Sequence, residues 1–400
     1  MSHFALVSWA AWLVVVVICW ALRSRAYATF RGVTLGLQVL IASALVRHYP
    51  AVFPAVVYLQ AAVFVSSLVL IRPRLRGLVY RATVSVPAAF FAAGTLLALP
   101  WAVVAGFGLT PHGAWFPYLL AAVGIVQSLT TREELIDVVV ADGENVGALR
   151  RHGRGKHRVI RPLKLVQITD PHLGPFMSVE RLRRICERAV ERAPDLVVLT
   201  GDFLTMESHD RPELLAQALE PLRALEGRTF ACLGNHDHEA LDTVRTALEK
   251  NGVELLVDSA TEVATPAGNV QLVGFDFVWR GRAEHLAAVT AAHPRKPGSL
   301  RLLLLHDPGA FRHLPEGEGD LVLSGHTHGG QVGFVSLGLP FTMMRAFVSA
   351  PDHGLWARGV DRLYVHRGTG HYGFPLRLGV PSEESVLQVH FGAPGPSAAQ

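Results

Sequence analysis

Side chains that commonly bind metal ions follow several short apolar segments in the second half of the chain. The densest group is the stretch GHTHGGQ, residues 325–331, which places His326 and His328 directly after the apolar run 320–324. A strand that runs into a tight turn would direct both imidazoles into one pocket. Two histidines at this spacing also occur in ordinary polar loops, so the remaining segments must decide between a metal site and a loop.

Four more apolar segments end in polar residues of the same kind. They cover 163–169, 195–200, 228–233 and 300–305, and they are followed by Asp170-Pro171-His172, Gly201-Asp202, Gly234-Asn235-His236-Asp237 and His306-Asp307. Ligands of α/β sheets bind outside the carboxyl ends of the strands. Each motif alone has an ordinary explanation, such as a turn or a helix cap. Five such motifs in order, each at a strand end, predict one shared site.

The predicted site contains two aspartates, one asparagine and four histidines. They are Asp170, His172, Asp202, Asn235, His306, His326 and His328. One metal ion binds about four to six ligands, whereas seven side chains with one shared carboxylate provide four ligands to each of two ions. The set therefore predicts a dinuclear centre. Its nitrogen and oxygen ligands suit Mn, Fe or Zn, and the three scattered cysteines form no CxxC motif.

The elements around these motifs predict an α/β domain. Apolar strands over 163–169, 195–200 and 228–233 alternate with helical patterns over 179–193, 212–225 and 239–251, and shorter β segments follow up to residue 391. Continuous apolar strands between helices are typical of a sheet that is covered on both faces. Helix-strand units followed by strand-rich sequence predict an α/β sandwich with two facing mixed sheets.

The front of the chain is predicted to be a membrane domain. Residues 1–131 contain eight arginines and no aspartate, glutamate or lysine. Uncharged runs over 4–22, 51–71, 83–107 and 114–130 have about the 20 residues needed to cross a bilayer, and a fifth run, 33–46, is shorter. The sequence thus predicts four or five transmembrane helices. The absence of ionisable groups within the runs favours an anchor over a transporter.

Charge bias predicts the orientation of this domain. With five spans, arginine clusters at 23–31, 72–81 and 132–164 fall on one side, which is the cytoplasmic side. We therefore expect a protein of the bacterial inner membrane with a cytoplasmic C-terminal domain. Residues 165–400 carry 21 basic and 28 acidic residues, so the high pI comes from the front of the chain. This distribution favours contact with a membrane over contact with nucleic acid.

The predicted domains are a transmembrane domain over 1–132, a basic linker over 133–162, a catalytic domain over 163–392 and a tail over 393–400. Within the linker, residues 134–140 fit a short strand. The basic stretch 150–161 fits either contact with anionic lipid head groups or a solvated connection.

The ordered motifs DxH, GD, GNHD, H and GHTHGGQ resemble those of the calcineurin-like metallophosphoesterase superfamily, especially its membrane-anchored branch that contains GHTHGGQ. The resemblance covers about residues 163–392, including the segment 366–383. It implies a first metal held by Asp170, His172, Asp202 and His328, and a second held by Asp202, Asn235, His306 and His326, with Asp202 as the bridge. It also implies that His236 faces the scissile phosphate and that Asp237 orients His236.

The expected function is that of a membrane-anchored, dinuclear-metal phosphoesterase. A phosphodiesterase that acts on a lipid-linked or small phosphodiester, by attack of a metal-activated hydroxide, is the main hypothesis. His236 would stabilise the phosphoryl group or protonate the leaving oxygen. The alternatives are a phosphoprotein or nucleotide phosphatase, and a non-catalytic membrane-bound sensor that retains the fold.

Substrate contacts are less defined by the sequence. Arg345, Arg367 and His371 are candidates for phosphate contacts or for ordinary surface positions. The apolar stretch 334–347 is expected to be either core or a lip that faces the bilayer. The native metals, the substrate and the oligomeric state stay open.

Overall fold

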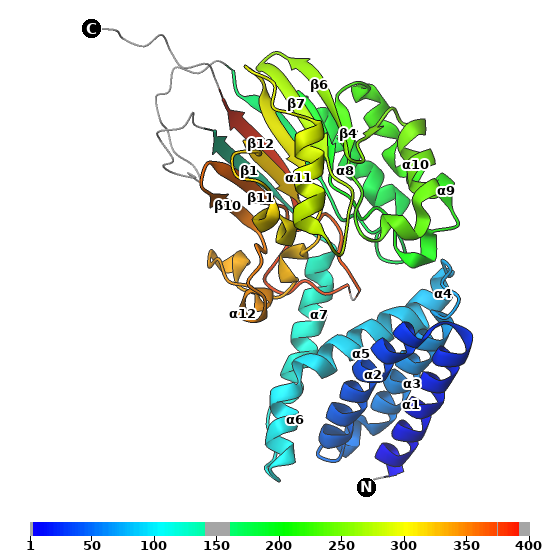
Figure 1. The fold of residues 1–400 in the computed structure, drawn as a ribbon. Coiled ribbons are helices and arrows are strands. Elements are labelled where there is room, and N and C mark those ends of the chain that lie inside the picture. The colour runs from blue at the N-terminus through cyan, green and yellow to red at the C-terminus, as the bar shows by residue number, and fades with distance from the viewer. Residues whose placement is uncertain (1–2, 141–160, 374, 392–400) are drawn as a thin grey trace. The chain divides into compact units, whose positions relative to one another are not determined.

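The computed structural model describes residues 3–140, 161–373 and 375–391, which fall into two units (Figure 1). The N-terminal unit comprises Met1–Leu129 together with Gly373–Leu378, and the catalytic unit comprises Thr130–Tyr372 and Gly379–Gln400. The expected basic stretch 150–161 lies outside the described residues except for Arg161, as does the whole tail 393–400.

The N-terminal unit is built from apolar helices. Ser24 separates the first two and caps the second, because its hydroxyl accepts the Tyr27 backbone N–H at 3.1 Å. The helices are α1 His3–Leu22, α2 Arg25–Val46, η1 Pro50–Val52, α3 Phe53–Val69, α4 Leu78–Tyr80, the π-helical η2 Arg81–Ser85, α5 Val86–Leu97, α6 Leu99–Gly106 and α7 Phe116–Ser128.

Three described helical segments are long and apolar enough to cross a membrane, namely His3–Leu22, Arg25–Val46 and Pro50–Val69. The run 33–46 was expected to be short but belongs to the 22-residue α2. The expected span 83–107 is broken, because α5 and α6 meet at an angle of 55°. Pro100 lies in the first turn of α6, where a proline ring disrupts the preceding helical hydrogen bonds. The expected span 114–130 contains a helix of only 13 residues, α7.

The catalytic unit contains two six-stranded sheets. The first has the order β1-β12-β2-β3-β4-β5 and the second the order β10-β11-β9-β8-β7-β6. The strands are β1 Thr131–Val139, β2 Leu163–Ile168, β3 Leu196–Leu199, β4 Thr229–Ala231, β5 Glu254–Leu255, β6 Ser259–Thr265, β7 Gly268–Gly274, β8 Leu300–Leu304, β9 Leu321–Ser324, β10 Gly354–Arg358, β11 Asp361–Val365 and β12 Ser382–His390. Both sheets are mixed, because antiparallel pairs such as β12–β2 and β6–β7 accompany the parallel ones.

The two sheets face each other across an apolar core. Leu165, Val198 and Phe230 of the first sheet and Leu302 and Leu323 of the second belong to one buried cluster. The outer faces are covered by helices, with α8–α10 on the first sheet and α11 on the second (Figure 1). This four-layer arrangement confirms the predicted α/β sandwich with two facing mixed sheets.

The covering helices and short turns complete the catalytic unit. They are α8 Val179–Glu191, η3 Met206–Ser208, α9 Pro212–Leu219, η4 Glu220–Leu225, η5 Asp237–Ala240, α10 Leu241–Lys250, α11 Arg282–Ala292, η6 Pro308–His313, η7 His328–Gly330, η8 Val335–Leu337 and α12 Met343–Phe347. Helix α11 has no counterpart in the sequence-based expectations.

The first sheet begins before the expected catalytic boundary at residue 163. Residues 131–139, expected to lie mostly in the linker, form the edge strand β1 and pair in parallel with β12 along its whole length. Only Leu129 and Thr130 separate the end of α7 from this strand. The connection between the last N-terminal helix and the catalytic sheet is therefore much shorter than the expected 30-residue linker.

Candidate metal centre

The five predicted motifs meet at the carboxyl ends of the central strands. Strands β2, β3 and β4 are mutually parallel, as are β7, β8 and β9, so the chain leaves each set of strands at one edge. There the structure forms two clusters of side chains that could hold metal ions. One contains Asp170, His172 and His328, and the other contains Asp202, His306 and His326. Six of the seven predicted ligands thus lie in the two clusters.

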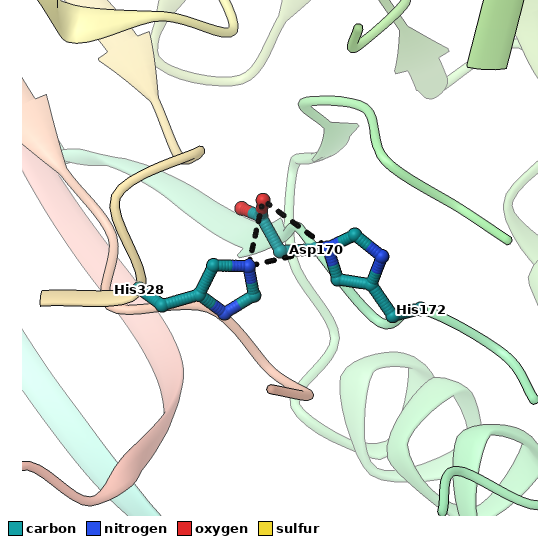
Figure 2. Close-up of side chains that lie close together, drawn as sticks. All are labelled: Asp170, His172 and His328. Carbon is teal, nitrogen blue, oxygen red and sulfur yellow. Dashed lines mark hydrogen bonds and ion pairs between the residues drawn. The ribbon is translucent and has the colours of Figure 1, made fainter. Parts of the chain in front are cut away.

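The first cluster joins the end of β2 to the turn after β9. Figure 2 shows Asp170 between the two imidazoles. His172 Nε2 lies 3.2 Å from His328 Nε2, and His328 Nε2 lies 3.4 Å from Asp170 Oδ1. All three side chains are buried. Two ring nitrogens and a carboxylate oxygen that face one buried point form a suitable set of donors for a divalent cation.

The second cluster joins the ends of β3, β8 and β9. His306 Nε2 lies 3.3 Å from Asp202 Oδ2 and 3.2 Å from His326 Nδ1. The other ring nitrogen of His306, Nδ1, lies 2.6 Å from Thr200 O. Because a carbonyl oxygen only accepts hydrogen bonds, Nδ1 must carry the proton. This contact leaves Nε2 as the atom available to a metal ion.

The seventh predicted ligand is Asn235, in the loop after β4. Its Oδ1 atom is buried and makes no hydrogen bond within the part of the chain that the structure describes. A buried amide oxygen without a partner is costly, and coordination of a cation would satisfy it. The orphaned oxygen is an observation in favour of bound metal that is independent of the two clusters.

Asp202 connects the two clusters. Its Oδ2 atom lies 3.3 Å from His306 Nε2 in the second cluster and 3.6 Å from His172 Nε2 in the first. Its Oδ1 atom accepts the backbone N–H of His236 at 2.9 Å. The carboxylate is therefore held between the two clusters.

Backbone strain is concentrated at these residues. Among the described residues, eight non-glycine residues have a positive φ, and five of them are Asp170, His172, Asp202, His326 and His328. Such conformations cost on the order of 1–3 kcal/mol each and persist only where surrounding contacts hold them. Here the His172 N–H donates to Asp202 O at 3.2 Å, and the His326 N–H donates to Asp170 Oδ2 at 2.9 Å.

Charge and burial set the protonation of the histidines. Burial lowers the pKa of His172 to about 4, and burial together with the charge on His306 lowers the pKa of His326 to about 4. Both rings are thus neutral near pH 7, which is the form that binds metals. Burial alone would lower the pKa of His306, but the negative charges of Asp202 and Asp170 raise it to about 10.

Asp237 binds backbone groups of the loops around it. Its carboxylate accepts the backbone N–H groups of Asp202, Phe203 and Gly234 at 2.7–2.8 Å. These contacts hold the loops after β3 and β4 together, and none of them involves the His236 ring. Asp237 therefore orients the backbone that carries Asp202, and its expected role in orienting the His236 imidazole stays a prediction.

His236 lies at the exposed side of the clusters. Its ring centroid lies 5.6 Å from that of His172 and 5.1 Å from that of Tyr372. The nearest carboxylate is Glu239, whose Oε1 lies 3.6 Å from His236 Nδ1. Burial alone would lower the pKa of His236, but Glu239 and the charge on Asp202 leave it above its ordinary value. An imidazole N–H at this place suits contact with a phosphate oxygen.

The three residues suggested as late phosphate contacts each have another contact in the structure. Arg367 is buried and forms ion pairs with Glu134 at 2.7 Å and Glu383 at 3.1 Å. Arg345 lies over the Trp356 ring at 5.3 Å. His371 is buried against Phe176, with ring centroids 5.7 Å apart.

Tyr372, next to His371, is the late residue that borders the site. Its ring centroid lies 5.5 Å from that of His172, and its backbone N–H donates to Gln331 Oε1 at 2.8 Å. Sequence reasoning missed Tyr372, although its place in the segment 366–383 was a usable signal. Beside the second cluster, the centroid of the Phe277 ring lies 6.2 Å from those of both His306 and His326.

Comparison with known proteins agrees with this geometry. Residues 163–330 match the family model described as calcineurin-like phosphoesterase. The chain is 32% identical to phosphodiesterase YaeI of Escherichia coli over 57% of this chain and 82% of that protein. The protein belongs to the calcineurin-like metallophosphoesterases and is a metal-dependent phosphoester hydrolase.

Two further relatives differ in what surrounds the shared domain. A transmembrane protein with a metallophosphoesterase domain from Danio rerio is 32% identical over 55% of this chain and 52% of that protein. UDP-2,3-diacylglucosamine pyrophosphatase LpxG of Chlamydia trachomatis is 27% identical over 52% of this chain and 78% of that protein. Together with the apolar helices of the N-terminal unit, the first of these similarities indicates a membrane protein.

Proposed function

We propose that this protein is a membrane-anchored phosphodiesterase with a dinuclear metal centre, and that it hydrolyses a lipid-linked or small phosphodiester. The observation that carries the proposal is the pair of buried clusters joined by the Asp202 carboxylate, 3.3 Å from His306 and 3.6 Å from His172. The names of the relatives from E. coli and C. trachomatis, a phosphodiesterase and a diacylglucosamine pyrophosphatase, support this substrate class.

The residues have separate roles in the proposed site. Asp170, His172, Asp202 and His328 would hold one divalent ion, and Asp202, Asn235, His306 and His326 the other, with Mn, Fe and Zn as the suitable metals. When bound, such a pair activates water as a nucleophile and neutralises charge on the phosphoryl group. His236 donates a hydrogen bond to a phosphoryl or leaving oxygen from the exposed side.

Tyr372 lies near the first cluster and Phe277 near the second. The Tyr372 ring packs near the rings of His172, His236 and His328, whereas the Phe277 ring packs near those of His306 and His326. Each cluster therefore has an aromatic side chain near it, which could pack against one substituent of a phosphodiester.

The activity can be tested with the full chain in detergent. We expect hydrolysis of bis-p-nitrophenyl phosphate that requires added Mn²⁺ and is abolished by a chelator. Asp202→Asn should lower kcat by about 1,000-fold or more, since it removes charge from both metal sites. Glu254→Gln, at an exposed position of β5, is the control.

Activity that survives chelation or Asp202→Asn would overturn the metal mechanism. A clear preference for p-nitrophenyl phosphate over the diester would replace the phosphodiesterase by a phosphatase. Intact metal binding without any hydrolysis would favour the sensor alternative.

For the orientation, we propose that the arginine-rich ends of the N-terminal helices and the catalytic unit lie on the cytoplasmic side of a bacterial inner membrane. Arg23 lies between α1 and α2, and Arg25 is the first residue of α2. Arg72, Arg74 and Arg76 lie between α3 and η2, and Arg81 is the first residue of η2. The loops 47–49 and 107–115 contain one arginine. Positively charged loops remain in the cytoplasm.

This orientation requires the chain to cross the bilayer at α7. At 1.5 Å per residue, its 13 residues extend about 20 Å, so uncharged neighbours must also lie in the membrane. In intact cells, a membrane-impermeant maleimide should fail to label Asn269→Cys, an exposed position near the start of β7, and should label it after lysis. Labelling in intact cells would reverse the proposed orientation.

A further inference from the structure

A short apolar segment projects from the catalytic unit directly after the metal-binding turn. Residues 334–348, here called the apolar lobe, include η8 and α12 (Figure 1). Seven large apolar side chains of the lobe are exposed to solvent: Phe334, Leu337, Leu339, Phe341, Met343, Phe347 and Val348. Leu337 and Phe347 are the most exposed, at 74% and 81%. The stretch is therefore not part of the core.

The base of the apolar lobe is ordered by specific contacts. The Phe334 N–H donates to Phe341 O at 2.9 Å, and the two rings stack with centroids 6.0 Å apart. Thr342, which is buried, donates from Oγ1 to Asp352 Oδ2 at 2.6 Å. The exposed apolar side chains thus belong to a built structure with a fixed base, as a docking surface requires.

The same contacts connect the lobe to the metal centre. Asp352 O accepts the Thr327 Oγ1–H at 2.6 Å, and Thr327 lies between the candidate ligands His326 and His328. Asp352 therefore binds the lobe through its side chain and the metal-binding turn through its backbone. The position of the lobe is set relative to the clusters, and a molecule held by the lobe lies beside them.

We propose that the apolar lobe inserts into the surface of a lipid bilayer and that the site takes its phosphodiester from that bilayer. This inference deepens the proposed function, on which its catalytic part rests. The lobe fits a bilayer by composition, since residues 321–351 contain no aspartate or glutamate and Arg345 is their only arginine or lysine. Exposed apolar side chains beside a basic residue are typical of surfaces that bind anionic membranes.

Chain connectivity favours the bilayer over a soluble partner. Gly379 O accepts the Ser336 N–H at 2.8 Å at the base of the lobe. The preceding residues, Gly373–Leu378, belong to the N-terminal unit, where the Arg377 N–H donates to Gly124 O on α7 at 3.0 Å. Gly379 thus joins the lobe, by a hydrogen bond, to the segment that directly precedes it in the chain. That segment packs on an apolar helix of a membrane protein.

The proposal can be tested with a fluorescent probe on the full chain. The three native cysteines are buried, so a thiol-reactive bimane will label only the introduced cysteine. One variant is Leu337→Cys in the lobe, and the other is Asn269→Cys at the exposed start of β7. The protein is reconstituted in vesicles of phosphatidylethanolamine and phosphatidylglycerol. We expect doxyl-labelled lipids to quench the probe at residue 337 by about twofold or more and to leave the probe at 269 unchanged.

Equal solvent exposure of the two probes would overturn the proposal. A probe at 337 that is shielded from water but not quenched by doxyl lipids would also overturn the proposal. A second copy of the chain or the N-terminal helices would then cover the lobe in place of the bilayer. This measurement requires no catalysis, so its outcome is independent of whether the protein is a phosphodiesterase.

A catalytic measurement then tests delivery of the substrate. The double variant Leu337→Gln/Phe347→Gln should lower hydrolysis of a fluorescent phosphodiester lipid in vesicles by about tenfold, which corresponds to weakened surface binding. Hydrolysis of soluble bis-p-nitrophenyl phosphate should stay within about twofold, because neither side chain contacts the clusters. Equal losses on both substrates would show that the lobe only supports the fold. An absence of activity toward every phosphodiester would reject the proposed function and leave the probe result intact.

Discussion

At the scale of single residues, the candidate metal-binding histidines differ in their protonation. Some are ready to bind metal, whereas one must first lose a proton. His172 and His326, with pKa values of about 4, are neutral at pH 7. His306, with a pKa raised to about 10 despite its burial, is protonated in the metal-free protein because Asp202 and Asp170 face it. A proton and a cation therefore compete for His306 Nε2, while Thr200 O keeps the proton on Nδ1.

This competition predicts a pH dependence of metal binding. Between pH 7 and 8, below the pKa of His306 and above the pKa of Asp170, which burial raises to about 6, each bound pair of ions displaces one proton from His306 Nε2. The binding constant should rise with pH by about tenfold per unit, and about one proton should be released. Calorimetric titration with Mn²⁺ in buffers of different ionisation enthalpy measures both quantities. Binding that is independent of pH in this range, with no proton released, would contradict the assignment of His306.

At the scale of elements, close packing between the strand ends fixes the candidate ligands. Gly325 connects β9 to the HxH turn, and a Cβ atom there would overlap Asp170 Oδ2 and Thr169 Oγ1. Gly325→Ala should therefore displace the Asp170 carboxylate from the first cluster while both sheets remain folded. We expect kcat to fall by about 100-fold with a small change in Tm. Gly106→Ala, where a Cβ meets nothing within 4 Å, is the matched control. Activity that survives Gly325→Ala would show that Asp170 can move without loss of function.

The same scale shows what the sequence could predict. The strands and the candidate ligands were predictable, because each motif combines an apolar run with polar residues at its end. The backbone contacts of Asp237 were not, since its three partners come from loops whose approach depends on the fold. The bend between α5 and α6 was also missed, because the sequence stays uncharged through it and its hydropathy does not change at the break. Strand β1 was expected only as an optional segment, since its partner β12 lies some 250 residues away in sequence.

At the scale of the whole catalytic unit, a buried ion-pair network joins the two sheets. Arg367, which follows β11 of the second sheet, pairs with Glu383 of β12 and Glu134 of β1 in the first. The Tyr364 hydroxyl donates to Glu383 as well. Burial alone would raise the pKa of Glu383, but the charges of Arg367 and His366 and the nearby hydroxyls lower it to about 2. The network thus binds the edge strand β1, which follows α7, to the core of the sandwich.

This network predicts how the catalytic unit loses stability in acid. Glu383 has a lower pKa in the folded chain than its ordinary value of 4.5, so its contribution is complete above pH 4.5 and disappears as the pH falls toward 2. A depression of this size corresponds to about 3 kcal/mol in the free energy of unfolding. Thermal unfolding of the full chain in detergent, compared with Glu383→Gln, should give a Tm difference that is constant from pH 7 to 5 and that shrinks below pH 4. Arg367→Gln leaves both carboxylates buried without their cation and should lower Tm more than Glu383→Gln at pH 7. A Tm difference between the wild-type chain and Glu383→Gln that does not change from pH 7 to 3 would show that the charge on Glu383 does not stabilise the folded chain.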